Sequence, residues 1–248
     1  MLKIALSLLL FMTTAANAWA GWVITEQSQG KTSQFYIQDN ALKDNNPAMV
    51  TLFDVEKGKI YFYKPKERVI WTGAPNQFLE EMEQARRTEL EALMATAPPE
   101  KRAAMRKGLD AQMKAIKTPQ KYQVKIVGPA DGGKVAGHST QKYQIFVENQ
   151  LQEEIWLANL PGLGKDLDLA KFAKLSRSFL APGVRSWETD PKILAVRAKG
   201  WPLKSIEYGP GGEKDESLVT GVEKRQIKKF LFDPPKGYRA VTLMQILR

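Results

Sequence analysis

Residues 49–72 read MVTLFDVEKGKIYFYKPKERVIWT. This stretch contains three short runs rich in β-branched and aromatic residues, at 49–55, 60–63 and 68–72. The polar segment Glu56-Lys57-Gly58-Lys59 separates the first two runs, and its glycine can adopt a positive φ. Strands joined by such short polar turns pair as antiparallel hairpins. The stretch therefore predicts a β-meander, and an antiparallel sheet as the centre of the fold.

The same pattern continues on both sides of the meander. Before it, residues 22–28 and 32–38 are predicted strands, separated by a turn at Gln29-Gly30-Lys31 and followed by a possible turn at Asp39-Asn40. After it, the predicted strands are 122–127, 135–148, 154–158, 201–208 and 217–232, with helices at 166–179 and 190–197. No internal repeat or low-complexity linker divides the chain. We therefore expect residues 21–248 to form a single α+β domain.

A helical segment interrupts the strands at about 76–117. Residues 76–96 contain no Gly or Pro, Pro98-Pro99 must break a continuous helix, and helical periodicity resumes at 100–116. The predicted hairpin is rich in methionine, a flexible side chain suited to irregular or changing surfaces. These methionines are Met82, Met94, Met105 and Met113. They suit either an adaptable lid over an apolar cavity or an ordinary core-facing stripe.

The N-terminus has the features of an export signal. Residues 1–20, MLKIALSLLLFMTTAANAWA, combine a charged Lys3, a short apolar run and small residues suited to signal peptidase. The apolar run of about nine residues is too short to span a bilayer, which requires about 20. The alternative is a retained anchor or a buried core helix. We expect cleavage near Trp19 or Gly21, no lipid anchor, because no cysteine follows, and a periplasmic or secreted protein.

Composition narrows the possible functions. The chain has no cysteine, which excludes disulfides and thiol chemistry. Its formal net charge of +10 favours acidic partners such as an anionic membrane surface or an envelope component, or simply keeps the protein soluble. Export would separate the protein from ATP and most nucleic acids, so we expect no nucleic-acid partner. The sequence leaves the oligomeric state open.

Catalytic motifs are missing from the sequence. The single histidine, His138, has no G-x-S-x-G serine to accompany it, and one histidine makes a poor zinc site. Gly162-Leu163-Gly164-Lys165 lacks the first glycine and the final Ser/Thr of a phosphate-binding loop. Carboxylates one or two positions apart, as within 80–83 and 166–168, do not share a helix face. We expect a non-enzymatic protein with no metal and no cofactor.

An ordered series of motifs resembles the DUF4412 family of secreted bacterial proteins, within the LolA/LolB lipoprotein-carrier-like superfamily. In chain order the motifs are Phe35-Tyr36-Ile37 with Leu42-Lys43, Phe53-Asp54 with Ile60-Tyr61, the segment 98–102, Gly137 and Tyr143 before Glu154-Ile155-Trp156-Leu157-Ala158, and Phe232 before Pro235-Lys236-Gly237-Tyr238. Thr140 stands where the family often has cysteine. The resemblance implies a strongly curved antiparallel sheet, an incomplete barrel, with helices covering its concave face.

Such a fold implies an apolar cavity, and hence a hydrophobic or lipid-like ligand. The candidate lining residues are Phe35, Phe53, Tyr61, Tyr63, Trp71, Phe146, Trp156 and the four methionines. The sequence alone does not assign each strand residue to a face, and plain core packing is an equal alternative for each. Three functions follow: a carrier of a hydrophobic ligand, an envelope interaction or structural module that uses the basic surface, and, third, a hydrolase.

Overall fold

A computed structural model describes residues 20–46, 48–117, 121–180, 186–209 and 211–248, with the side chains of 109–117 outside the description. Its strands are β1 (Ala20–Ser28), β2 (Lys31–Gln38), β3 (Ala41–Asn45), β4 (Val50–Asp54), β5 (Lys59–Lys64), β6 (Val69–Gly73), β7 (Val124–Val135), β8 (His138–Val147), β9 (Gln150–Ala158), β10 (Trp201–Tyr208), β11 (Lys214–Gln226) and β12 (Arg239–Ala240). Its helices are α1 (Pro75–Thr96), α2 (Pro99–Lys117), α3 (Leu163–Asp166), α4 (Leu169–Ser178), α5 (Pro191–Arg197), α6 (Leu243–Leu247) and the 3₁₀ turns η1 (Ser186–Thr189) and η2 (Lys229–Phe232).

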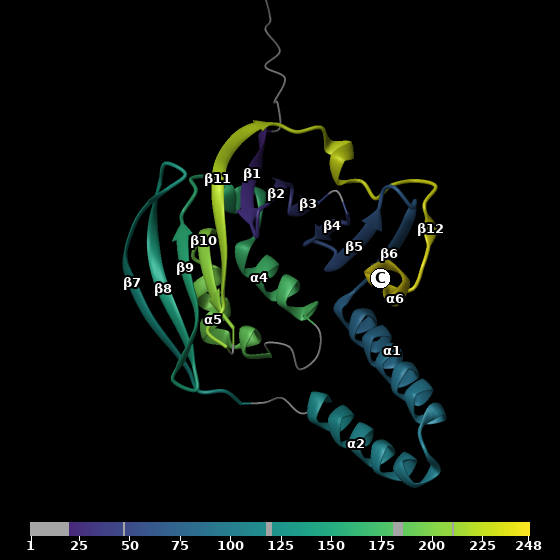
Figure 1. Cartoon of the computed structure of the whole chain (residues 1–248). Helices are drawn as coiled ribbons and strands as arrows, with labels where there is room; N and C mark the ends of the chain where they lie inside the picture. The colour runs from purple at the N-terminus through teal and green to yellow at the C-terminus, as the bar shows by residue number, and fades with distance from the viewer. Residues whose placement is uncertain (1–19, 47, 118–120, 181–185, 210) are drawn as a thin grey trace, which may run out of the picture.

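The twelve strands of the described ranges belong to one sheet, in the order β12-β6-β5-β4-β3-β2-β1-β11-β10-β9-β8-β7. Neighbouring strands in the described residues are antiparallel, except that the short β12 runs parallel to β6. The sheet bends strongly and stays open, and α4 and α5 lie on its inner side (Figure 1). The predicted α+β class, with a strongly curved antiparallel sheet and helices on its concave face, is therefore confirmed.

Tight turns set the register of the sheet. Gln29-Gly30, Asp39-Asn40, Ala136-Gly137 and Glu148-Asn149 each connect two strands, and both residues of each pair have a positive φ. Two-residue turns of this kind match the right-handed twist of the flanking strands. The turns at Gln29-Gly30 and Asp39-Asn40 follow the sequence prediction. They bring residues 22, 37, 42 and 53 into one row across four strands.

The β2–β3 turn holds the helices against the sheet. The backbone N–H of Asn40 donates to Asp166 O at 2.8 Å, and the Asn40 side-chain oxygen accepts from the Asp168 N–H at 2.7 Å. The Trp22 indole N–H donates to the Asp166 carboxylate at 2.9 Å. Asp168 also caps α4, because its side chain accepts from the Lys171 N–H. These bonds fix the start of α4 over the concave face.

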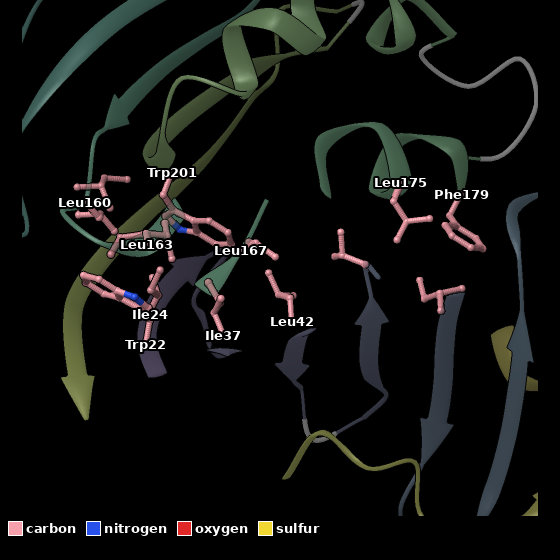
Figure 2. Close-up of a cluster of buried hydrophobic side chains, with 14 of the residues drawn as sticks. Trp22, Ile24, Ile37, Leu42, Leu160, Leu163, Leu167, Leu175, Phe179 and Trp201 are labelled. Atoms are coloured by element: carbon pink, nitrogen blue, oxygen red, sulfur yellow. The ribbon is translucent and has the colours of Figure 1, made fainter. Parts of the chain in front are cut away.

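The main core lies between the concave face and these helices. It includes Trp22, Ile24, Ile37, Leu42 and Trp201 from the strands, with Leu163, Leu167, Leu175 and Phe179 from the segments that cover them. Figure 2 shows Leu175 of α4 and Phe179, which directly follows this helix, above the strands, with Trp22 and Trp201 towards the other end of the cluster. Burying a large apolar side chain stabilises a fold by about 1.5–3 kcal/mol. This cluster therefore joins sheet and helices into one body.

The helices α1 and α2 form an arm that projects away from the sheet (Figure 1). The break between them falls at Ala97 and Pro98, as the proline pair predicts. Within the arm, Leu90, Met94 and Met105 make a small cluster of their own. The base of α1 instead joins the main core through Phe78 and Met82. The base of the arm therefore packs on the main core, whereas the described apolar residues of its outer part pack on one another.

The structure corrects several predicted elements. Residues 41–45 form β3, which was not predicted as a strand. The single helix predicted at 166–179 is two helices, because the extended Leu167 ends α3 and Asp168 caps α4. The strand predicted at 217–232 begins at Lys214 and ends at Gln226, after which the chain enters η2. The predicted signal peptide lies almost wholly outside the described residues, since β1 begins at Ala20.

Candidate functional site

A pocket of about 310 Å³ lies between the concave face of β2–β5 and α4. The strands contribute Phe35, Leu42, Asp44, Thr51, Phe53, Ile60 and Phe62, while Phe172, Ser176 and Phe179 come from α4 and its end, and Trp201 from β10. The register explains this set, because Phe35 pairs with Asp44, Asp44 with Thr51, and Thr51 with Phe62 on adjacent strands. Directly paired residues point to the same face of a sheet.

Aromatic rings dominate the wall of this pocket. Phe53 meets Phe172 edge to face, with ring centroids 5.4 Å apart, and Phe172 stacks on Trp201 at 6.1 Å. Phe35 also contacts Trp201, at 5.9 Å. Such contacts fix the orientation of each ring beyond what simple burial achieves. The pocket is therefore lined by interlocked aromatic rings, and its volume lies at the lower end of the range for small-ligand sites.

Asp44 is the one ionisable residue among those that line this pocket. Its Oδ1 atom is buried, with no hydrogen-bond partner in the described part of the chain. Burial raises the pKa of Asp44 to about 6. Glu26, on β1, points to the same face of the sheet as Asp44. Its pKa is raised to about 7, mainly by burial and further by the charge of Asp44. Two carboxylates thus face an apolar concavity, which makes their charged forms costly.

A separate buried charge cluster joins β9, α4, η1 and α5. Arg177 pairs with Glu188, and Arg197 donates to Glu153 at 2.6 Å. Burial raises the pKa of Glu153, while the charges of Arg197 and Arg177 oppose that rise. Because opposite charges are matched here, we interpret the cluster as structural. No group of three or more His, Asp or Glu residues suited to a metal ion occurs within the described ranges.

The structure places two of the predicted residues, Phe35 and Phe53, in the pocket wall. Trp71 is on the same face but lies in the adjoining core, stacked on Phe62 at 5.7 Å. Met82 packs against that core from α1. These four residues therefore lie in or beside the concave region.

The other predicted residues lie elsewhere. Tyr61 and Tyr63 point to the convex face, where the C-terminal segment covers them through Phe232 and Tyr238. Trp156 is also convex, with the ammonium groups of Lys142 and Lys204 at 4.6 Å and 5.2 Å from its ring.

Phe146 also points to the convex face, because it alternates along β8 with Ile145 and Val147, which are buried on the opposite face. Met94 and Met105 pack within the arm, and the side chain of Met113 lies outside the described residues. Strand aromatics occur on both faces because the C-terminal segment creates a second apolar layer.

Sequence reasoning missed most of the pocket wall. Asp44 lies on the strand that was not predicted, and the prediction chose Tyr61 and Tyr63 of β5 but not Phe62 between them, which points into the pocket. Phe172 and Phe179 could have been identified from their spacing. They are seven positions apart, which is about two helical turns, so a helix through this segment places both on one side. Trp201 gave no signal, since its partners lie on distant segments.

Comparisons with known proteins add little to this picture. A scan against protein-family models gives no match, and a search of curated proteins gives none. Among solved structures the chain is similar to one titled "Crystal structure of MucB", with 13% identity and a TM-score of 0.34. The match covers 91% of this chain and 61% of that one, so this chain spans about three fifths of the MucB chain. A likeness this distant gives no information on function.

Proposed function

We propose that this chain is a non-enzymatic protein of the bacterial envelope, periplasmic or secreted, that binds a hydrophobic, lipid-like ligand on its concave face. The observation that supports the proposal is the aromatic pocket between β2–β5 and α4. An alkyl chain gains about 0.8 kcal/mol for each methylene that it buries. Eight buried carbons would contribute about 6 kcal/mol before the losses that accompany binding, and micromolar affinity requires about 8 kcal/mol, so affinity should rise with chain length without directed chemistry. No described helix has the length and apolar character needed to cross a bilayer.

Membership of the DUF4412 family stays a prediction, as does export by the signal at residues 1–20. Both fit a carrier that exchanges cargo outside the cytoplasm. The predicted cleavage near Trp19 or Gly21 would leave the Trp22 bond to Asp166 intact. The sheet and the pocket would then be complete in the mature protein.

Filling the pocket tests the proposal. Thr51→Phe adds a ring on the concave face beside Asp44, and we expect it to lower the affinity for the neutral fluorophore N-phenyl-1-naphthylamine by at least about tenfold, or about 1.4 kcal/mol. Thr72→Phe is the matched control, because Thr72 is exposed and follows the inward-facing Trp71 on β6. Equal probe binding by the parent protein and both variants would contradict a ligand site here.

Cargo is tested directly by extracting lipids from protein purified from its native compartment and identifying them by mass spectrometry. We expect a hydrophobic molecule in the parent sample and its loss in Thr51→Phe. If neither co-purified molecules nor probe binding is found, the basic interaction module becomes the better interpretation. The exposed helix α2 favours that alternative, since Lys101, Arg106 and Lys107 point to solvent.

A further inference from the structure

The Asp44 carboxylate faces the aromatic pocket without a cation of its own. In the described part of the chain no ion pair forms at Asp44, and its Oδ1 atom is buried without a hydrogen bond. The neighbouring Lys43 points the other way. Its ammonium group donates to Leu231 O at 3.3 Å and lies 5.9 Å from the Tyr63 ring on the convex side. The sheet therefore separates this lysine from the pocket.

The helix above the pocket does not neutralise Asp44 either. On α4, Arg177 pairs with Glu188 and Lys171 lies 3.9 Å from Asp168, while Lys174 is exposed. Glu26 on the same concave face is a further carboxylate, and its charge repels that of Asp44. Leaving the half-buried Asp44 carboxylate unpaired destabilises the fold, so a cationic ligand would relieve this cost.

The remaining lining suits the same kind of ligand. Phe35, Phe53, Phe62, Phe172 and Trp201 surround the pocket, and the faces of aromatic rings attract cations. Rings that enclose a quaternary or alkyl ammonium group are a recognised way of binding such ions, and an adjacent carboxylate supplies the counter-charge. Purely aliphatic cargo would leave the carboxylate without a counter-charge.

We propose that the pocket selects hydrophobic ligands that carry an organic ammonium group, with Asp44 as the counter-ion and the aromatic rings as the cage. This inference rests on the proposed function and specifies its ligand class. Because burial raises the pKa of Asp44 only to about 6, its carboxylate is charged at pH 8, where the test is made.

Isothermal titration calorimetry with three eight-carbon probes tests the selection. We expect octyltrimethylammonium to bind about tenfold more tightly than octanol, a difference of about 1.4 kcal/mol, and octyl sulfate to bind more weakly than octanol. The protein's net charge of +10 attracts anions nonspecifically, so a preference for the cation cannot come from the overall charge. A further titration with a short-chain lysophosphatidylethanolamine then tests whether the ammonium group comes from a lipid headgroup or from a free alkylamine.

Asp44→Asn should reduce the affinity for octyltrimethylammonium to that of the same variant for octanol. Asp54→Asn is the matched control, because Asp54 pairs with Lys57 at the exposed β4–β5 turn. Phe62→Leu keeps an apolar wall and removes one ring, so it should weaken binding of the cation more than binding of octanol. This second variant keeps the test decisive if Asp44→Asn fails to fold.

The outcomes separate the two proposals. Equal binding of all three probes overturns ammonium selection and leaves hydrophobic binding standing. Tightest binding of the sulfate, or an unchanged cation affinity in a folded Asp44→Asn protein, also overturns it. No binding of any probe contradicts the proposed function itself.

Discussion

Glu26 and Asp44 place two carboxylates on the concave face of β1 and β3, where the described residues supply no ion pair to either. Glu26 continues the inward row of Trp22 and Ile24 along β1, and Asp44 continues that of Leu42 along β3. An alternating strand with a carboxylate on its apolar face loses stability, because the charged form is poorly solvated there. Such positions are expected where a binding site limits the choice of residue.

Glu26→Gln should stabilise the protein at neutral and higher pH. Burial raises the pKa of Glu26 from 4.5 to about 7, so the folded state holds a proton that the unfolded state releases between these values. Stability from this group is therefore present below pH 4.5 and is lost as the pH rises towards 7. We expect the variant to gain on the order of 2 kcal/mol at pH 8, after discounting for partial exposure, and almost nothing at pH 4.

Urea denaturation at both pH values measures this difference. Glu56→Gln, in the exposed β4–β5 turn, should leave the free energy of unfolding unchanged at both. A stabilisation of Glu26→Gln that is the same at pH 4 and pH 8 would exclude titration of Glu26 as its cause.

At the scale of elements, local sequence predicted the units better than their boundaries. Turn chemistry identified the hairpins at Gln29-Gly30 and Asp39-Asn40, and the proline pair located the break between α1 and α2. The boundary errors have a common physical source. Residues 41–45 are too short and polar to be recognised as a strand, and they become one because Leu42 pairs with Ile37 on one side and Phe53 on the other.

Glu81 connects three elements, and its removal should cost more than the loss of a surface charge. Its carboxylate accepts from the Trp71 indole N–H at 2.9 Å and from the Leu243 backbone N–H at 2.8 Å, which joins α1 to β6 and α6. Glu81→Ala leaves both donors unpaired, and Trp71 is only 3% exposed. We expect a loss of about 2–3 kcal/mol in the free energy of unfolding.

The neighbouring Glu80→Ala provides the control, because Glu80 is exposed on the same helical turn. Its expected change stays within about 0.5 kcal/mol in the same urea titration. Equal losses in the two variants would mean that the Glu81 bonds contribute nothing to stability.

At the scale of the whole molecule, the candidate site depends on contacts that no local pattern reveals. The pocket joins strands at residues 31–64 to α4 and β10, more than 100 positions away. Strand periodicity shows that Phe53 and Phe62 alternate with their neighbours, yet it does not say which face meets α4 and which meets the C-terminal segment. That choice follows from the order of the sheet and from the Asn40 bonds that hold α4 in place.

The arm formed by α1 and α2 would act as a lid only if it covered the pocket. No described residue of either helix lines the pocket, and Met94 packs on Leu90 and Met105 away from the main core. We therefore expect the outer part of the arm to unfold without the sheet, whereas Met82 contributes to the main core at the base of α1.

Hydrogen exchange on Met94→Asp and Met82→Asp tests this division. Burying a charge at Met94 should accelerate exchange in the outer half of α1 and in α2, while sheet amides and binding of the naphthylamine probe stay unchanged. Met82→Asp should lower global stability by about 2–4 kcal/mol and accelerate exchange throughout the sheet. Leu93→Asp is the control for Met94, because Leu93 is already 54% exposed on the same turn. If Met94→Asp abolishes probe binding while the sheet stays protected, the arm gates the pocket, and the lid interpretation replaces that of a separately packed arm.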